Sequence, residues 1–401
     1  MDNHLRTEQV PMLILNGKVV LPEEVTDTAI AVVEGKIDAF LQGEDDVNHW
    51  LSQHADASVI DAGGQYVLPG FIDIHCDAIE KEVQPRPNTL FPLDMALVEF
   101  ERKLPIHGIT TMYHSLSLGV GLSLRGDHLL TGMVDHIINY RSKRSVVRNR
   151  IHLRFEVSHL AGMPIVESLL NEKMIDYLSF MDHSPGQGQY RELGSFERYV
   201  MKNQGVSQDE VKVIVEELIM RRQQVNADQL IQLSKLAAKQ GIAIASHDDD
   251  SAKKVDESVG YGVSVCEFPI NMETAKYAME QGLHVCVGAP NVVRGASHDK
   301  NLRAVDAITA EAADILCSDY HPSSMLAAVF KLAKLEIAAL PAAVRMATLH
   351  PAQALGVADE LGSIELGKAA DLIVVDHYEE MPLVTNTIIG GHIVYRSSVR
   401  Y

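Results

Sequence analysis

Hydrophobic and polar positions are patterned differently at the two ends of the chain and in its middle. Residues 12–66 form short apolar segments with alternating polar positions, separated by glycines, which is typical of a small β layer. From about residue 68, short runs rich in Ile, Val and Leu are each followed by a longer amphipathic stretch. This second pattern indicates βα units around a parallel sheet.

Eight apolar runs in the middle part are the predicted strands. They are GFIDIH (70–75), GITTMYHS (108–115), IHLRFEVS (151–158), DYLSFMDH (176–183), GIAIASHD (241–248), VSVCEFPI (263–270), HVCVGAP (284–290) and DILCSDY (314–320). Eight strand–helix units favour a closed (β/α)8 TIM-type barrel over an open doubly wound sheet. One long helix is predicted over 207–241, with Ser207 as its N-cap and Gly241 as its C-cap.

The end of the chain returns to β character in GSIELGKAADLIVVDH and NTIIGGHIVY. We expect residues 346–401 to join residues 1–66 in one small β-sandwich domain. Residues 67–345 would then form the barrel beside it. No glycine-rich nucleotide-binding motif follows a strand in the sequence, which argues against a nucleotide-binding fold.

Composition narrows the possible partners and the compartment. The chain has 401 residues and a formal net charge of −19, which argues against nucleic acid or an anionic membrane as a partner. No apolar run reaches the length of a membrane span, and the first residues lack a secretory signal pattern. The four cysteines have no pairing or zinc-ribbon spacing. A reducing cytoplasm is the expected location.

Ionisable side chains interrupt the first predicted strand where it leaves the core. Side chains on a strand alternate between its two faces. We therefore expect Ile72, Ile74 and Cys76 to pack on the outer helices. Asp73, His75 and Asp77 would point into the barrel, with the last two at the C-terminal end, where barrel enzymes place their active sites.

Four further strands show the same change from apolar to ionisable residues. On the third strand, His152, Arg154 and Glu156 share the face opposite Ile151, Leu153 and Phe155. Later strands end in the groups Asp182 and His183, His247 and Asp248, and Asp319. A lone histidine at a strand end is usually structural, and Asp248 to Asp250 could cap the next helix. Because the pattern recurs at five strands, the sequence predicts a site for one or two divalent cations.

At these residues the chain resembles the amidohydrolase superfamily. The resemblance extends from VLPGFIDIH, through His183, His247 and Asp319, to HPAQALGV and LGSIELGKAADLIVVD. It implies a distorted (β/α)8 barrel with a small β-sandwich and a centre of one or two metal ions. It also implies that Asp319 binds metal and handles protons. The implied metal ligands are His75, Asp77, Glu156, His183, His247 and Asp319.

Three features depart from the superfamily pattern. The usual His-x-His motif is replaced by His75-Cys76-Asp77. The common carboxylated lysine bridge has no obvious candidate, but Glu156 could bridge, as glutamate does in some branches. His183 and His247 also follow the fourth and fifth predicted strands, one strand earlier than the superfamily pattern places them. The mixed nitrogen and oxygen ligands suit zinc, manganese or iron.

Five longer segments resemble one branch of the superfamily more closely: GFIDIHCDAIEKEVQPRPN, MDHSPGQGQYR, SHDDDS, GAPNVVRGASH and CSDYHPSSML. That branch hydrolyses the phosphoanhydride of α-D-ribose 1-methylphosphonate 5-triphosphate in phosphonate catabolism and releases pyrophosphate. Cationic and polar residues in two loops at the C-terminal barrel end would bind such a substrate, since arginine matches phosphate in a bidentate manner. These predicted substrate-binding residues are Lys81, Arg86, Asn291, Arg294 and His298.

Other functions and side-chain roles remain open from the sequence. The main alternative is a hydrolase of amides or cyclic amides, such as a deacetylase or a dihydroorotase. A catalytically silent barrel that serves as a scaffold is the second alternative. A homodimer is compatible with the superfamily. Tyr320 and His321 could contact substrate, and His114 could face the site or lie in the core.

Overall fold

The computed structural model describes residues 10–86, 89–119, 127–188, 194, 196–197, 201, 208–297 and 301–398. Eight parallel strands form one sheet in sequence order, which curls into a barrel. They are β8 (Phe71–Cys76), β9 (Ile109–Leu118), β10 (Arg148–Glu156), β11 (Tyr177–Met181), β12 (Ala243–His247), β13 (Val265–Glu267), β14 (His284–Gly288) and β15 (Ile315–Cys317). An isolated parallel bridge between Cys76 and Asp319 joins the last strand to the first. The predicted barrel class and all eight predicted strands are confirmed.

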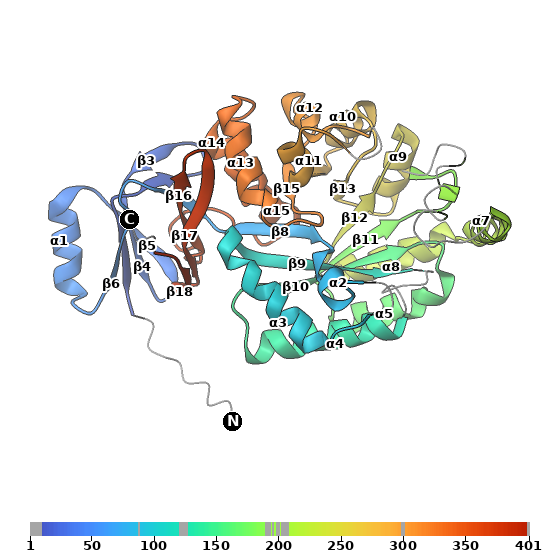
Figure 1. The fold of residues 1–401 in the computed structure, drawn as a ribbon, viewed down its shortest axis with the longest axis horizontal. Helices are drawn as coiled ribbons and strands as arrows, with labels where there is room; N and C mark the ends of the chain where they lie inside the picture. Colours follow the sequence, from blue (N-terminus) through green and yellow to red (C-terminus); the bar gives the residue numbers. More distant parts are fainter. Residues whose placement is uncertain are drawn as a thin grey trace.

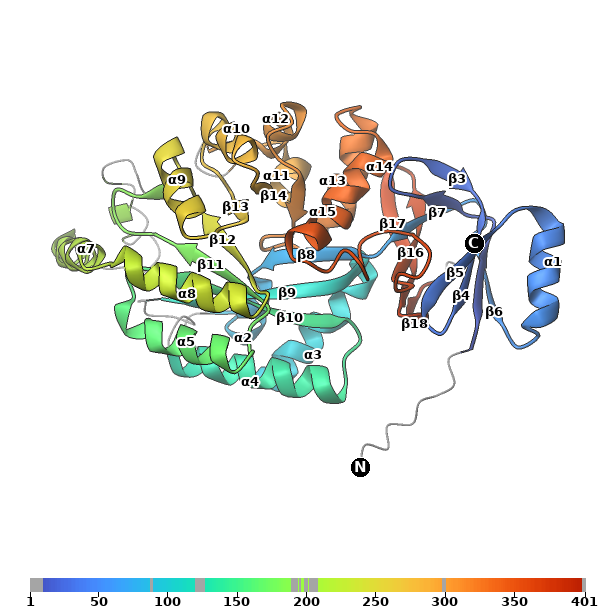
Figure 2. The ribbon, with the colours of Figure 1, turned by 180° about the vertical axis from the view of Figure 1, so that it is seen from behind.

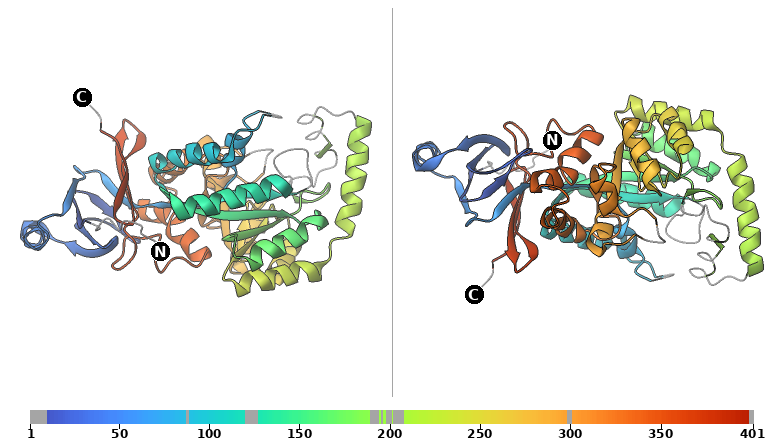
Figure 3. Two further views of the ribbon diagram at one scale, coloured as in Figure 1. Left: turned by 90° about the horizontal axis from the view of Figure 1, so that it is seen from below. Right: turned by 90° about the horizontal axis from the view of Figure 1, so that it is seen from above.

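Helices cover the outside of the barrel (Figure 1). They are α2 (Ala78–Val83), α3 (Leu93–Lys103), α4 (Asp127–Lys143), α5 (Met163–Asn171), α7 (Gln208–Gln223), α8 (Ala227–Lys239), α9 (Ala252–Gly260), α10 (Met272–Glu280), α11 (Ala289–Arg294), α12 (Ala304–Thr309), α13 (Ser324–Lys334), α14 (Leu340–Met346) and α15 (Leu349–Ala354). Short 3₁₀ turns lie at Pro105–His107 and Leu160–Gly162. In Figure 3, α7 (yellow-green) stands at the end of the molecule farthest from the β-rich ends of the chain.

The single long helix predicted over 207–241 is wrong, because the chain breaks it into α7 and α8. Asn226 caps the start of α8, where its side chain accepts a hydrogen bond from the backbone N–H of Asp228 at 2.9 Å. The predicted cap Ser207 lies outside the described residues. Gly241 follows the end of α8 with a φ of +71°, which fits a helix end in the left-handed region.

Two further sheets lie beside the barrel, one built from the N-terminal part of the chain alone and one built from both ends of the chain (Figure 2). One has the order β5 (Lys36–Leu41), β4 (Ala29–Val33), β1 (Met12–Leu15), β6 (Ser58–Asp61), and α1 (Gly43–Gln53) lies beside it. The other has the order β18 (His392–Arg396), β17 (Met381–Ile389), β16 (Leu372–Tyr378), β7 (Tyr66–Pro69), β2 (Lys18–Val20), β3 (Val25–Asp27). A shared apolar cluster, including Ile14, Ile30, Val67 and Leu372, packs between the two sheets as a sandwich. The division into residues 1–66 plus 346–401 and 67–345 stays a prediction.

Two apolar clusters show which way the barrel side chains point. One cluster joins Tyr113, Tyr177, Val265 and residues of other barrel strands to α15, so it lies inside the barrel. The other cluster joins alternate strand residues, including Ile151, Leu153 and Phe155, to the surrounding helices. The predicted orientation of β10 is therefore confirmed, with its apolar residues outside.

For β8 the predicted orientation is partly wrong. Ile72 and Ile74 belong to the cluster inside the barrel, and Cys76 belongs to the outer one. Asp73 is fully buried, and its Oδ1 accepts a hydrogen bond from the backbone N–H of Ser318 at 3.0 Å, next to β15. The pairing of β8 with β9 shifts register between Asp73 and Cys76, so strict alternation does not hold there.

Candidate active site

Ionisable side chains from six of the eight strands meet at the C-terminal end of the barrel. His75 lies on β8, Arg154 and Glu156 lie on β10, and His247 and Glu267 end β12 and β13. His183 follows β11, the fourth barrel strand, and Asp319 follows β15. The structure thus places His183 and His247 on the fourth and fifth strands, as the sequence predicted. Parallel strands of a closed barrel bring these residues together from distant parts of the chain.

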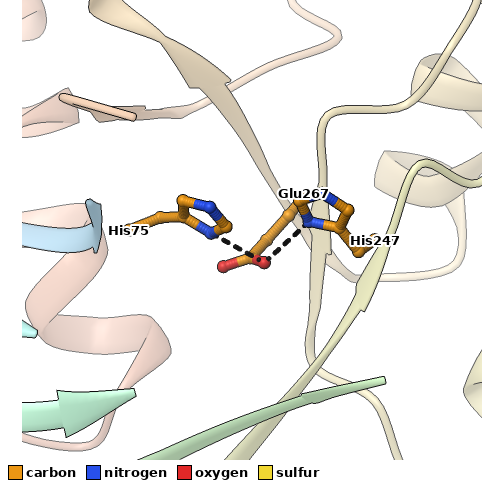
Figure 4. Close-up of side chains that lie close together, drawn as sticks. All are labelled: His75, His247 and Glu267. Carbon is orange, nitrogen blue, oxygen red and sulfur yellow. Dashed lines mark hydrogen bonds and ion pairs between the residues drawn. The ribbon is translucent and has the colours of Figure 1, made fainter. Parts of the chain in front are cut away.

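The first group of potential metal ligands consists of His75, His247 and Glu267, whose ligand atoms lie within 4.8 Å of one another. Glu267 Oε2 lies 3.0 Å from His75 Nδ1 and 3.3 Å from His247 Nδ1. Figure 4 shows the carboxylate between the two imidazole rings. Tyr177 donates a hydrogen bond from its hydroxyl to the other oxygen of Glu267, at 3.1 Å, which fixes the carboxylate. His75 Nδ1 is buried without a hydrogen-bond partner despite its short contact with Glu267.

The second group consists of His183, His247 and Asp248. Asp248 Oδ2 lies 3.7 Å from His183 Nε2 and 3.9 Å from His247 Nε2. On the other side of its ring, His183 Nδ1 lies 3.0 Å from Glu156 Oε2, and Glu156 also accepts from the His183 backbone N–H. A carboxylate in this position orients the ring of a ligating histidine. His247 belongs to both groups, with a different ring nitrogen facing each.

Asp77 and Asp319, two predicted ligands, lie at the seam that closes the barrel and belong to neither group. The Asp77 backbone N–H donates to the Asp319 carbonyl at 2.8 Å, and the Asp319 N–H donates to the His75 carbonyl at 2.9 Å. Asp77 Oδ1 is buried without a hydrogen-bond partner. Burial raises the pKa of Asp319 to about 7, and the negative charge of Asp77 adds to the effect.

Three residues just after the strands adopt the left-handed backbone region that favours glycine. They are Asp248, Phe268 and Asp319, with φ of 58°, 54° and 59°. Each such residue costs about 1–3 kcal/mol and persists where the surroundings enforce it, often at functional sites. The Phe268 ring packs against His75 and His247, with centroid distances of 4.9 and 5.3 Å. The strain therefore lies at one member of the ligand groups, at the aromatic ring that packs on two of their histidines, and at Asp319 on the barrel seam beside them.

The site keeps two of its histidines neutral. Burial, aided by the Arg154 guanidinium, holds the pKa of His75 well below its usual value. Burial does the same for the pKa of His247, against the opposing effect of its hydrogen bond to Glu267. For His183, burial lowers the pKa, but the contacts with Asp248 and Glu156 outweigh burial and raise it to about 9. Neutral imidazole is the form that binds a metal, so binding at His183 would release a proton.

The donor set of these groups suits a divalent metal. Imidazole nitrogens and carboxylate oxygens are ligands of zinc and of other first-row divalent ions. An unsatisfied Nδ1 on His75 and an unsatisfied Oδ1 on Asp77 are costly when buried unless an ion or another partner takes them up. The structure therefore supports the predicted metal centre in its general form.

Three residues of this arrangement were missing from the ligand and substrate-binding sets that the sequence predicted. Glu267 ends β13, with the same change from apolar to ionisable that marks the other strand ends. Asp248 does not cap α9, because Ser251 does so through the N–H of Lys254. The sequence places Arg154 on the interior face of its strand and assigns it no role. Each signal was present in the sequence, but only proximity in the folded barrel assigns these residues to one site.

Four of the predicted substrate-binding residues are among those that the structure describes; they lie at the same barrel end and differ in their surroundings. Lys81 and Arg86 are exposed at and after α2, and Lys81 Nζ lies 5.4 Å from the ring centroid of Tyr320. Arg294 is exposed at the end of α11. Asn291 instead binds the backbone at Leu302 and Ala304, at 3.1 Å each, which gives it a structural role and does not support substrate contact. His298 lies outside the described residues.

A pocket of about 370 Å³ adjoins the second ligand group and is lined by His247, Asp248 and Asp182, among other residues.

His114 lies in the core and not in the site, since it is fully buried and its Nε2 lies 2.7 Å from Asn149 Oδ1. None of the helices among the described residues is both long and apolar enough to cross a membrane.

Known proteins agree with this architecture. Residues 199–394 match the amidohydrolase family. The chain is 35% identical over 372 residues to the alpha-D-ribose 1-methylphosphonate 5-triphosphate diphosphatase of Escherichia coli (strain K12), covering 90% of this chain and 94% of that one. This chain belongs to the amidohydrolase family.

Two solved structures share the fold of this chain. A Xaa-Pro dipeptidase with bound methionine in the active site has a TM-score of 0.65 at 15% identity, covering 96% of this chain and all of its own. N-acetylglucosamine-6-phosphate deacetylase from Pasteurella multocida has a TM-score of 0.59 at 15% identity, covering 96% of this chain and 99% of its own. At such low identity these two structures support the fold and say nothing of the substrate.

Proposed function

We propose that this amidohydrolase is a metal-dependent diphosphatase. It hydrolyses the phosphoanhydride of α-D-ribose 1-methylphosphonate 5-triphosphate, or of a close analogue, to the 5-phosphate and pyrophosphate. The observation that carries the proposal is the 35% identity to a diphosphatase of this substrate over nearly the full length of both chains. The two ligand groups at the C-terminal barrel end provide a site of the kind that such a hydrolysis requires.

Both ligand groups have assigned roles in this proposal. His75, His247 and Glu267 hold one divalent cation, with Asp77 and Asp319 beside them. His183, His247 and Asp248 are the candidates for a second, with Glu156 orienting His183. Zinc, manganese and iron all suit these donors, and one ion or two can be accommodated. A bound divalent cation supplies charge neutralisation at phosphoryl oxygens and lowers the pKa of water.

Asp319 is the residue that handles the proton. Its carboxylate is buried at the barrel seam, where burial raises its pKa to about 7 and a bound cation would lower the pKa again, so the group can accept and return a proton on the acid side of neutrality. Lys81 and Arg294 lie exposed at the rim, where their charges would draw in a phosphorylated small molecule despite the negative net charge of the chain. Four buried free cysteines support a reducing cytoplasm as the location.

Phosphorus NMR of the products tests the proposal. The purified protein, supplied with zinc or manganese, is incubated with α-D-ribose 1-methylphosphonate 5-triphosphate and with other ribose 5-triphosphates. Formation of pyrophosphate together with the 5-phosphate is expected. Formation of orthophosphate together with the 5-diphosphate would instead indicate cleavage at the terminal phosphoryl group. A His247→Asn variant, which removes a member of both ligand groups, confirms that any activity comes from this site.

The same assay separates the alternatives. If no triphosphate is hydrolysed but an N-acyl sugar or a cyclic amide is, the metal site stays as proposed and the proposed reaction is replaced by amide hydrolysis. If no substrate is turned over and elemental analysis finds no divalent ion in the purified protein, a scaffold function is favoured. Size-exclusion chromatography of the same sample determines whether the chain forms a homodimer.

A further inference from the structure

Arg154 is the one lysine or arginine that is buried among the residues that the structure describes. It lies on β10 between His152 and Glu156 and points into the site. Its Nη1 lies 3.8 Å from Asp77 Oδ2, beyond hydrogen-bond distance. Its Nη2 donates to His247 Nε2 at 3.3 Å, and its Nε has no hydrogen-bond partner. The guanidinium therefore lacks an aligned anionic partner.

The other two arginines of β10 have such partners. Arg150 Nη1 lies 3.1 Å from Asp176 Oδ1, and Arg148 forms an ion pair with Asp371. Removing a cation from water is costly, and only a well-aligned counter-charge offsets this cost. Arg154 is buried at the barrel end that carries the two ligand groups, and no carboxylate is aligned with it. Its guanidinium is therefore available to bind an anion from solution.

We propose that Arg154 binds the β-phosphoryl group of the triphosphate, which flanks the anhydride bond that breaks and leaves as part of pyrophosphate. The inference rests on the proposed diphosphatase function and adds a residue to it. Arg154 lies between Asp77 and His247, and His247 belongs to both ligand groups, so an anion bound by the guanidinium lies next to the reacting centre. The planar guanidinium can donate two parallel hydrogen bonds to phosphoryl oxygens, which a lysine cannot reproduce.

A purely structural role makes different predictions from substrate contact. If Arg154 only oriented Asp77 and His247, its loss would reduce metal binding and leave the affinity for pyrophosphate of the metal-loaded protein unchanged. If Arg154 contacts the phosphoryl group, its loss weakens pyrophosphate binding and slows turnover while the metal content stays constant. Pyrophosphate, the product of the proposed reaction, therefore serves as a probe that needs no turnover.

The experiment compares Arg154→Met and Arg154→Lys with the wild type and with Arg150→Met, a control on the same strand whose side chain is partly exposed. The quantities measured are kcat and KM on the triphosphate, the inhibition constant of pyrophosphate, and metal content. We expect Arg154→Met to lower kcat by roughly 100- to 1,000-fold. We also expect pyrophosphate inhibition to weaken by about 10-fold or more, at unchanged metal content. Arg150→Met should resemble the wild type.

Chemical rescue gives a second readout. In Arg154→Ala, added guanidinium ion should restore part of the lost kcat, which a role in packing alone would not allow. If Arg154→Met does not fold, the Arg154→Lys variant decides, because it keeps the charge and loses only the planar fork. Wild-type kcat and wild-type pyrophosphate inhibition in the variants would overturn the inference. A wild-type protein that cleaves no phosphoanhydride would instead overturn the proposed function.

Discussion

Glu267 Oε2 lies 3.0 Å from His75 Nδ1, although the strands that carry these residues, β13 and β8, are not neighbours in the barrel. The contact spans the interior, and His247 approaches the same oxygen from β12 at 3.3 Å. Both side chains of the contact are fully or almost fully buried. A carboxylate held by Tyr177 and placed between two neutral imidazoles is preorganised to receive a cation.

The first prediction concerns this carboxylate. Glu267→Gln keeps the shape of the side chain and removes its negative charge, so metal affinity should fall by roughly 10- to 100-fold. Isothermal titration calorimetry of the metal-free protein with zinc or manganese measures the change in metal affinity. Glu273 lies exposed on α10, and Glu273→Gln is the matched control with unchanged affinity. Equal metal affinity in Glu267→Gln and the wild type would remove Glu267 from the ligand group.

The second prediction concerns the proton-handling role of Asp319. Asp319→Asn should lower kcat by roughly 100- to 10,000-fold, because an amide cannot accept a proton. Burial raises the pKa of this carboxyl to about 7, and a bound cation lowers it again by stabilising the carboxylate. The kcat/KM of the wild type should therefore decline on the acid side with an apparent pKa below 7. Asp306→Asn, on the exposed side of α12, should leave the pH profile unchanged.

The barrel could be predicted from the sequence because its signal is local. Each buried parallel strand is a short apolar run of its own, and the eight runs match β8 to β15. The face of β8 could not be predicted by alternation alone, because the register shift between Asp73 and Cys76 depends on pairing with β9. Irregular pairing of this kind is a property of the assembled sheet and leaves no period in the sequence.

The site could be predicted only as a set of candidates. Strand ends identified His75, His183, His247 and Asp319, but each of the two ligand groups also contains a carboxylate outside the predicted ligands. Glu267 meets His75 across the interior, and Asp248 reaches His183 and His247 from a left-handed backbone conformation. Distances between strands that are not neighbours follow from barrel closure, and residue type alone does not show which non-glycine residue adopts a positive φ.

The third prediction concerns the rim of the site. Lys81 Nζ lies 5.4 Å from the ring centroid of Tyr320, next to Asp319, so this exposed cation sits where a phosphorylated substrate would enter. Lys81→Met should raise KM for the triphosphate by about 10-fold with a smaller change in kcat, because a contact far from the reacting bond stabilises substrate and transition state alike. Steady-state kinetics measures both. Lys103 pairs with Glu82 at 2.5 Å, and Lys103→Met is the control. A KM of Lys81→Met equal to that of the control would exclude Lys81 from substrate binding.

The fourth prediction concerns acid stability and involves a residue outside the site. Burial lowers the pKa of His114 from 6.5 to about 4, against the opposing effect of its hydrogen bond to Asn149. The folded state therefore favours the neutral ring, while the unfolded chain protonates near pH 6.5. This contribution to stability is fully present above 6.5 and is lost as the pH falls towards 4. The free energy of unfolding that this residue contributes falls by about 2 kcal/mol between about pH 7 and about pH 5.

His114→Gln tests this contribution, because glutamine can still donate to Asn149 Oδ1 and does not titrate. The urea midpoint of the wild type should fall on moving from about pH 7 to about pH 5, and the variant should lose less over the same interval. His49 lies exposed on α1, so His49→Gln should retain the wild-type dependence. If His114→Gln and His49→Gln lose the same stability between the two pH values, the acid sensitivity of the fold does not come from His114. The buried histidines at the site, whose pKa values are also lowered, would then account for it.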